Sequence, residues 1–266
     1  MRAIEELASA TAKRLIGFVF DVDDTLTRSG RLEEAAYSAL WRLRDAGLLL
    51  IAVTGRPLGF AEILARMWPI DVAVGENGAG YIRVTEAGLQ RGFYAPDLIR
   101  LEHEQRLTGI QQRVARQAPF AKVTDDSWAR RCDATWDVGE RVRLTAAQIA
   151  QLRAIIESEG ARCVVSSVHA HAMVGEYDKA RGAVQAARET LGYDIATERE
   201  RWLFVGDSGN DSAAFEYFPE SAAVANVAPF LQQFHVPPRY VSRGDRGVGF
   251  AEIAALVLQR RLEATP

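Results

Sequence analysis

The sequence has few cysteines, little net charge and no long hydrophobic run, and each of these absences excludes a class of protein. The two cysteines among 266 residues, Cys132 and Cys163, exclude a disulfide framework and lack metal-ligand spacing. The two residues can form one disulfide or remain as thiols, and we expect two thiols in a cytosolic chain. The net charge of −3 provides no basic field for nucleic acid or for an anionic membrane, although local basic clusters can still bind small anions.

The apolar segments are too short to place the chain in a membrane. The longest one, residues 47–53, has the length of a strand. Residues 1–17 include charged side chains such as Glu5 and Lys13 and lack the apolar stretch of a secretory signal. We therefore expect a cytoplasmic protein with neither a membrane nor a nucleic acid as partner. No heptad-spaced apolar stripe is present, and the oligomeric state stays open.

Both ends of the chain alternate short apolar runs with amphipathic stretches. A hydrophobic content of 48% is enough for a sizeable core. The alternation predicts parallel strands joined by crossover helices, that is, a doubly wound Rossmann-like α/β sheet. Strands are predicted at residues 15–21, 48–54, 71–75, 202–206, 222–225 and 239–242, and helices at 32–46, 58–67, 179–191, from 210 and at 248–262.

The middle third of the chain has a different pattern. Its strand-like runs are more polar, which suits a sheet covered on only one face. Helices are predicted at residues 97–117 and from Thr145, which has capping-box spacing to Gln148. We therefore predict that residues 81–177 form an inserted α+β cap domain, and that residues 1–80 and 178–266 form the core.

Acidic side chains follow two of the predicted core strands. Asp21, Asp23 and Asp24 come after the first, and Asp207 and Asp211 follow the strand at residues 202–206. Parallel α/β sheets bind ligands at the carboxyl ends of their strands. Several carboxylates at one edge are costly unless a cation neutralises them, and Mg²⁺ prefers such oxygen ligands. The sequence therefore predicts an Mg²⁺ site at this edge.

These motifs resemble those of the haloacid dehalogenase superfamily phosphatases. The four motifs of that family occur in order as Asp21-Val22-Asp23-Asp24-Thr25-Leu26, Thr54, Lys179 and Gly206-Asp207-Ser208-Gly209-Asn210-Asp211. Further segments resemble the sugar-phosphatase branch that carries a large α/β cap, namely Val53-Thr54-Gly55-Arg56-Pro57, Glu76-Asn77-Gly78-Ala79 and Asp178-Lys179. Asp24 is a departure, because a glycine is commoner there.

The resemblance implies a role for each matching residue. Asp21 is the expected nucleophile, and Asp23 the acid and base that also offers its carbonyl to the metal. Asp207 is expected to bind Mg²⁺ directly, with Asp211 supporting the metal shell. Catalytic or phosphate-binding roles are implied for Thr54, Gly55, Arg56, Asn77, Lys179 and Asn210.

The predicted cap offers candidates for substrate contact just before Lys179. Ser166, His169 and His171 lie there, and in a strand the two histidines share one face. No nearby cysteine or third histidine completes a metal set, so substrate contact or sheet packing is favoured over metal binding. The adjacent Arg130 and Arg131 can meet an anionic group, although a solvated pair is the favoured interpretation. Core packing is expected for Trp128 and Trp136 at least as much as stacking on a sugar.

The resemblance implies hydrolysis of a phosphate monoester, with a small phosphorylated molecule as partner and a sugar or sugar-acid phosphate as the expected class. One alternative is a phosphosugar mutase, since some phosphomannomutases share the core and cap type. Another is a non-catalytic binding protein on the same fold, which would usually have lost its nucleophile or a metal ligand.

Overall fold

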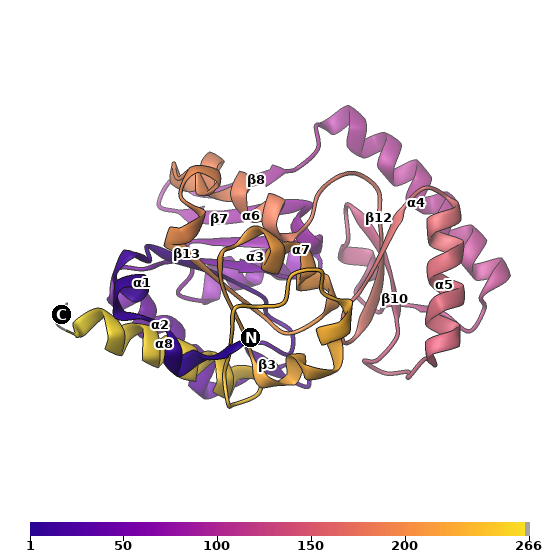
Figure 1. The fold of residues 1–266 in the computed structure, drawn as a ribbon. Helices are drawn as coiled ribbons and strands as arrows, with labels where there is room; N and C mark the ends of the chain where they lie inside the picture. Colours follow the sequence, from indigo (N-terminus) through magenta and orange to yellow (C-terminus); the bar gives the residue numbers. More distant parts are fainter. Residues whose placement is uncertain (264–266) are drawn as a thin grey trace.

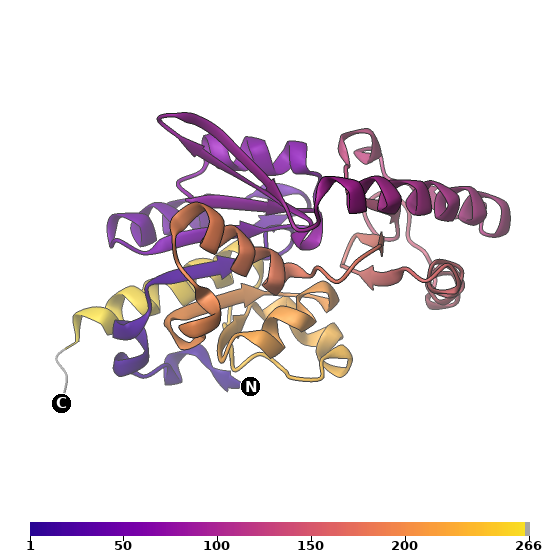
Figure 2. The same ribbon diagram turned by 90° about the horizontal axis from the view of Figure 1, so that it is seen from above.

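The computed structural model describes residues 1–263, which form a large α/β body and a smaller sheet-and-helix body beside it (Figure 1). The first strand and the last helix both lie in the large body. Seen from above, the helix α4 (Asp97–Gln117) extends along the smaller body and away from the large one (Figure 2). Within the described residues, no helix combines the length and the apolar composition needed to cross a membrane.

The large body is built on one nine-stranded sheet. Its strands are parallel except for the last two, which form an antiparallel hairpin. In spatial order they are β1 (Arg2–Ala3), β15 (Tyr240–Val241), β14 (Glu220–Ala223), β13 (Trp202–Gly206), β2 (Gly17–Phe20), β5 (Leu49–Val53), β6 (Val72–Gly75), β7 (Gly80–Thr85) and β8 (Gly88–Phe93).

Helices cover both faces of this sheet, which is the doubly wound α/β architecture that the sequence predicts. Two separate apolar clusters fill the space between the helices and the sheet. On one face lie α1 (Ser9–Arg14), α2 (Glu34–Asp45), α3 (Leu58–Met67) and α8 (Arg246–Leu262), and on the other α6 (Lys179–Ala186) and α7 (Ser212–Tyr217). Because both faces are covered, strands such as β2 and β13 are buried throughout and read as continuous apolar runs.

One strand lies two residues earlier than its apolar pattern indicates. The sequence predicts a strand at residues 222–225, but β14 spans Glu220–Ala223, where it pairs with β13. Its first residue, Glu220, is buried and forms ion pairs with Arg14 and Arg239. A pattern search for apolar residues excludes such an acid, since only the tertiary partners make its burial possible.

The second body begins later in the chain than predicted. Residues 81–93, assigned to the insert from the sequence, form most of the β7–β8 hairpin on the edge of the large sheet, where β7 pairs with β6. The separate four-stranded sheet starts at β9 (Lys122–Val123) and continues through β10 (Asp133–Asp137), β11 (Arg162–Val165) and β12 (His169–Met173). The half-polar pattern of the hairpin reflects an edge strand of the core rather than a new domain.

The small sheet is covered on both faces, not on one as expected. Its apolar face, with Ala134, Trp136 and Ala170, packs on α4 and α5 (Ala146–Ser158). Its polar face is also buried: His169 and His171 are 2% and 1% exposed. These side chains alternate with the apolar ones along β12 and therefore point to the opposite side, toward the large body.

Several local predictions are confirmed. Thr145 caps α5, with its hydroxyl accepting from the Gln148 N–H and the Gln148 side chain accepting from the Thr145 N–H. The two cysteines are free and buried.

A short hairpin, β3 (Thr27–Arg28) with β4 (Arg31–Leu32), follows the first acidic cluster and borders the site described next.

Candidate active site

Three adjacent strands of the large sheet end in the polar residues that the motifs contain. The strand β2 lies between β13 and β5. Asp21 directly follows β2, Asp207 follows β13 and Thr54 follows β5. Because the three strands are parallel, their carboxyl ends meet at one edge, and the structure brings residues more than 180 positions apart into one site.

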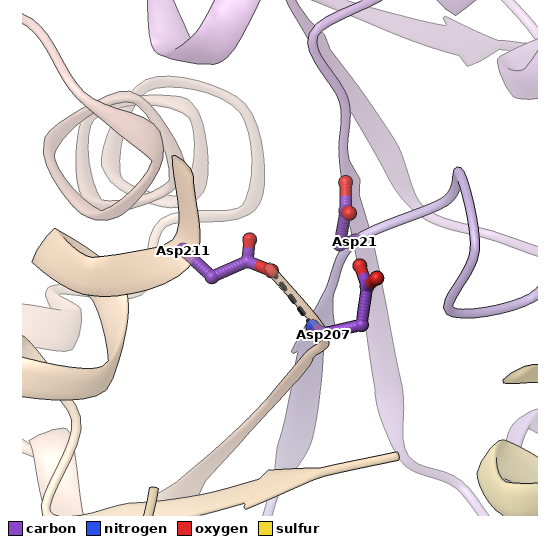
Figure 3. A group of neighbouring side chains, drawn as sticks. All are labelled: Asp21, Asp207 and Asp211. Atoms are coloured by element: carbon purple, nitrogen blue, oxygen red, sulfur yellow. Dashed lines mark hydrogen bonds between the residues drawn. The ribbon is translucent and has the colours of Figure 1, made fainter. Parts of the chain in front are cut away.

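Three buried carboxylates form the centre of this site (Figure 3). One oxygen atom of each of Asp21, Asp207 and Asp211 lies within 4.8 Å of the others. Burial raises the pKa of Asp21 to about 7 against the opposing charge of Lys179. Burial, followed by the neighbouring Asp21 and Asp211, raises the pKa of Asp207 well above its ordinary range. The cluster therefore carries negative charge that its surroundings do not stabilise, and a cation would relieve it.

The Lys179 ammonium is the cation that the chain itself supplies to this cluster. Its Nζ lies 2.7 Å from Asp21 Oδ1 and 2.7 Å from Asp211 Oδ1. Burial opposes its charge, but the two carboxylates outweigh burial and hold the pKa of Lys179 above its ordinary value. One ammonium facing three carboxylates leaves an excess of negative charge. This acid cluster explains why a lysine is tolerated at the beginning of α6, the wrong end of a helix for a cation.

Two glycines let α6 approach closely enough to deliver Lys179. Gly78 lies in the turn after β6 with a φ of +108°, and a Cβ atom there would stand 2.0 Å from the carbonyl oxygen of Asp178. A Cβ on Gly182, one turn into α6, would stand 2.3 Å from the Cα of Gly78. Any side chain at either position would push the helix away from the strand ends and displace the ammonium.

Asp211 is held by the chain on both of its oxygens. Its Oδ1 accepts from Lys179, and its Oδ2 accepts from the backbone N–H groups of Asp207, at 2.8 Å, and Ser208, at 3.1 Å. Asp207 is oriented by two residues that sequence reasoning did not assign: the Thr25 hydroxyl donates to Oδ1, and the Asn226 amide donates to Oδ2. Thr25 is part of the first motif, so its role could have been predicted from the sequence. Asn226 belongs to no motif, and no sequence pattern indicates its role.

The donor set fits a hard divalent cation. In an octahedral Mg²⁺ site with bonds of about 2.0–2.1 Å, neighbouring ligand oxygens lie roughly 3–4 Å apart. The separations within 4.8 Å among the three carboxylates are compatible with that spacing. Asp21 Oδ2 has no hydrogen-bond partner within residues 1–263, so a lone pair is available beside Asp207. The residues present therefore fit Mg²⁺.

Arg56 joins the first acidic cluster to the small body. Its guanidinium binds both carboxylate oxygens of Asp23, at 3.0 Å each for the closest contacts, and its Nη2 lies 2.9 Å from Glu140 Oε1. Glu140 also accepts from His169. The hydrogen bond from His169 and those from Arg56 lower the pKa of Glu140 to about 2. Arg56, a candidate for substrate contact, is thus already engaged by two carboxylates in this structure.

The opposite side of the site is lined by small polar groups from the loops after β5, β6 and β13. Thr54 is fully buried. Asn77 has a φ of +54°, and its Oδ1 accepts from the Asn210 amide at 3.1 Å. Within residues 1–263 the Asn77 Nδ2 is buried without a hydrogen-bond partner, and it lies against Gly55, where a Cβ atom would be 3.3 Å away. A buried amide donor without a partner, next to a residue of the cavity wall, suits an anionic ligand.

The cap residues predicted to contact substrate lie in the same cavity as the acidic cluster. Ser166 forms the turn before β12, with its hydroxyl accepting from the His169 N–H at 3.0 Å. The wall of this cavity is formed by Asp21, Asp23, Gly55, Ser166, Ser167, Val168, His169, His171, Ser208 and Asn210. The structure therefore brings residues of both bodies around Asp21.

Glu76 ties the two bodies together and was quoted from the sequence only as part of a motif. It is fully buried, and its carboxylate accepts from the backbone N–H groups of Leu58, Arg131, Cys132 and Asp133. Burial, with the nearby Asp133 charge, raises the pKa of Glu76 to about 7. Through these hydrogen bonds the Glu76 carboxylate holds residues 131–133 of the small body against the large one, in addition to the two chain connections.

Arg130 is buried rather than solvated, which corrects the expectation from the sequence. Its side chain is 2% exposed, and its guanidinium binds Asp126 and Asp133 and donates to the Gly55 carbonyl at 2.9 Å. Asp126 and Asp133 are local in sequence, and the expectation failed because the large body, through the Gly55 carbonyl, covers this local pair of ion pairs. Trp128 is 86% exposed and therefore not in a core, whereas Trp136 is in the core of the small body.

We expect Arg130→Met to lower the free energy of unfolding by about 3–5 kcal/mol, because it leaves buried carboxylates without their cation. Urea denaturation measures this difference. The neighbouring exposed Arg131 gives the matched control, and Arg131→Met should change stability by no more than about 0.5 kcal/mol. Equal effects of the two substitutions would contradict the assignment of Arg130 as the buried link between the bodies.

His171 is held in one orientation by Asp133. Its Nδ1 lies 2.8 Å from Asp133 Oδ2, and both side chains are buried. Burial lowers the pKa of His171 to about 4, against the opposing charge of Asp133. The neutral ring therefore donates from Nδ1 to the carboxylate, and its Nε2, which lies close to Gly55, is left as an acceptor.

This burial predicts a pH dependence of stability. Between pH 6.5 and about 4 the unfolded chain binds a proton at His171 that the folded chain does not. The free energy of unfolding therefore decreases as the pH is lowered through this window, and His171 contributes at most about 3 kcal/mol to the decrease. We expect His171→Asn to flatten the curve there relative to the wild type, in denaturation measured at successive pH values. The exposed His235 serves as the control, and His235→Asn should keep the wild-type slope.

Comparison with known proteins finds relatives of this chain. Residues 18–90 match the family described as haloacid dehalogenase-like hydrolase. A phosphoglycolate phosphatase from Methanoculleus marisnigri is 28% identical over 226 residues, which cover 79% of this chain and 83% of that protein.

Solved structures share the fold over nearly the whole chain. A Thermoplasma acidophilum protein superposes with a TM-score of 0.69 at 19% identity, covering 92% of this chain and 99% of the other. The sucrose-phosphatase from Synechocystis, solved with sucrose and phosphate, gives 0.66 at 17% identity, covering 92% and 98%. The C-terminal domain of a Candida albicans trehalose-6-phosphate phosphatase gives 0.68 at 13% identity, covering 97% and 98%.

The two lines of similarity agree with the motifs read from the sequence. The family match begins at the strand that carries Asp21, and the shared fold extends over both bodies. Together they show that this chain resembles the haloacid dehalogenase-like hydrolases, and they support its assignment as a phosphatase enzyme.

Proposed function

We propose that this phosphatase is Mg²⁺-dependent and hydrolyses the phosphate monoester of a sugar or sugar acid through an aspartyl-phosphate on Asp21. The observation that carries the proposal is the buried Asp21 carboxylate, held by the Lys179 ammonium within 4.8 Å of two further carboxylates at the strand ends. A carboxylate fixed in this way has a free oxygen to offer to phosphorus.

In the first step an oxygen of Asp21 forms a bond to phosphorus, and the bond between phosphorus and the alcohol oxygen breaks. Asp23 gives its proton to the departing oxygen. In the second step Asp23 takes a proton from water, whose oxygen attacks phosphorus, and the bond to Asp21 breaks. Inorganic phosphate leaves and the carboxylate is restored. Arg56 binds both oxygens of Asp23 in this structure, so one of these contacts must open before Asp23 can carry the proton that it donates.

The transferred phosphoryl group needs fixed donors for its negative charge. We assign these to Lys179, the Thr54 hydroxyl and the Asn77 amide, whose Nδ2 is buried without a partner. Asn210 orients Asn77 through its hydrogen bond. His171 of the cap lies so close to Gly55 that a side chain at position 55 would contact the imidazole ring.

Asp207 and Asp21, with the backbone carbonyl of Asp23, are the proposed Mg²⁺ ligands. Asp211 orients the site rather than binding the ion, because both of its oxygens already accept hydrogen bonds from the chain. When bound, Mg²⁺ would supply positive charge to the phosphate oxygens and lower the repulsion between phosphate and carboxylate.

We propose that the smaller body, residues 94–177, is a cap that selects the substrate, and that the rest of the chain is the catalytic core. The cap places His169, His171 and Ser166 in the cavity of Asp21. These are polar side chains that can hydrogen-bond to hydroxyl groups. The sugar class is supported by the similarity to a sucrose-phosphatase and a trehalose-6-phosphate phosphatase, which share this fold.

The test is a panel of phosphorylated sugars and sugar acids, assayed for released phosphate with Mg²⁺ and with EDTA. We expect release from at least one substrate with Mg²⁺, none with EDTA, and recovery when Mg²⁺ is restored. Asp207→Asn should lose this activity, whereas the exposed Asp45→Asn should keep it. Interconversion of positional isomers without phosphate release would identify a mutase instead. Release that is unaffected by EDTA would contradict the metal dependence.

A further inference from the structure

A second cavity adjoins the one that contains Asp21. It has a volume of about 630 Å³ and opens between the core and the cap. Asp23, Ser167 and Val168 line both cavities, so the two spaces adjoin at the proposed acid. A substrate with its phosphate at Asp21 and its leaving oxygen at Asp23 would therefore extend toward the larger cavity.

The charged side chains of this larger wall are paired, with two exceptions. Arg56 binds Asp23 and Glu140, and Arg246 lies 2.9 Å from Asp24 Oδ1. The exceptions are Asp207, which has neutral hydrogen-bond partners only, and Arg143. Within residues 1–263 the Arg143 side chain makes no hydrogen bond or ion pair. With Asp207 assigned to the metal, Arg143 is the cation of the wall that remains for the substrate.

Hydrogen bonds fix the backbone of the loop that contains Arg143. The Asp137 carboxylate accepts from the backbone N–H groups of Gly139, Glu140 and Arg141, and the Leu144 N–H donates to the Val138 carbonyl at 3.1 Å. The loop thus holds the base of Arg143 at the cavity, while its exposed side chain stays free to meet a ligand.

Arg143 does not line the small cavity around Asp21. Its partner is therefore a part of the substrate other than the scissile phosphate. A guanidinium binds carboxylate or phosphate through paired charge-assisted hydrogen bonds. We infer that Arg143 is a specificity-determining residue that binds a second anionic group, a carboxylate or a second phosphate, on the leaving-group side of the substrate.

This inference rests on the proposed phosphatase reaction and deepens it. It selects, among phosphate monoesters, those of sugar acids, hydroxy acids and bisphosphorylated sugars over those of neutral sugars. Arg141 provides a matched control: it is on the same loop, 72% exposed, paired with Asp125, and it lines a different cavity.

The experiment compares substrate pairs that differ in the second anion. 6-Phosphogluconate against sorbitol 6-phosphate tests a carboxylate, and fructose 1,6-bisphosphate against fructose 6-phosphate tests a phosphate. For the anionic member of at least one pair we expect Arg143→Gln to lower kcat/KM by about tenfold, mainly through KM, because one exposed charge-assisted contact is lost. The neutral member should change by less than about twofold.

Arg143→Lys should recover part of the loss, and Arg141→Gln should behave as the wild type. The pair that responds tells carboxylate from phosphate. Equal losses on both members of each pair, or no loss on any anionic member, would overturn the inference. p-Nitrophenyl phosphate distinguishes failure of the inference from failure of the proposed reaction. If the wild type hydrolyses this ester but shows no Arg143-dependent preference for anionic substrates, the inference alone fails. If the wild type hydrolyses no phosphate ester, the proposed reaction fails and the inference fails with it.

Discussion

Asp21→Asn is expected to lower the rate of phosphate release by at least about 10⁴-fold, the scale seen when an enzyme loses its nucleophile. The amide cannot form the bond to phosphorus, and no other carboxylate is placed to replace it, because Asp211 is held by Lys179 and two backbone N–H groups. Release of phosphate at saturating substrate and Mg²⁺ measures the loss.

The same substitution should leave the protein folded. It removes one of three crowded carboxylates, while Lys179 keeps its contact with Asp211. We therefore expect the metal-free variant to unfold at a temperature equal to or above that of the wild type. Asp45→Asn, on the surface of α2, is the control for a charge change alone. Activity retained in a folded Asp21→Asn protein would exclude Asp21 as the nucleophile.

Lys179→Met is expected to lower both stability and activity strongly. It removes the ammonium that compensates Asp21 and Asp211 at 2.7 Å and leaves buried carboxylates facing one another. Without metal, the free energy of unfolding should fall by about 3–5 kcal/mol. Activity should fall as well, by about 10²–10³-fold, because a fixed charge on the phosphoryl oxygens is lost.

Mg²⁺ gives this prediction a distinctive signature. The variant has more uncompensated negative charge than the wild type, so added Mg²⁺ should raise its unfolding temperature by more than it raises that of the wild type. Thermal denaturation with and without Mg²⁺ measures both shifts. Lys122→Met is the matched control, since Lys122 is exposed on β9 and binds only a backbone carbonyl. A smaller Mg²⁺ shift in Lys179→Met would contradict the placement of the metal beside this ammonium.

Local patterns predicted much of the core. Where a strand is buried on both faces, its apolar run stands out, and β13 spans the residues that the sequence indicates. The capping residues of α5 and the bounds of α4 follow equally from short-range signals. These features depend on neighbours along the chain, which a single sequence contains.

Three of the predictions that failed depend on contacts with segments distant in sequence. Glu220 is part of a buried strand because two arginines from other segments neutralise it. Residues 81–93 join the core because β7 finds an edge strand to pair with. Arg130, with its local partners Asp126 and Asp133, is buried because the segment of Gly55 lies against it. In each case the energy of burial is set by groups whose proximity no local pattern records.

For the candidate site, the sequence by itself determined the motif residues Asp21, Asp23, Lys179, Asp207 and Asp211, since parallel strands must deliver their carboxyl ends to one edge. Only the tertiary structure decided how their charges are distributed. It engages both oxygens of Asp211, pairs Asp23 with Arg56 and joins the small body to the large one through Glu76. Within residues 1–263 it leaves Arg143 without an ion pair at the cavity wall. The physical reason is that electrostatic pairing falls off within a few ångströms, so it depends on distances that only the folded chain fixes.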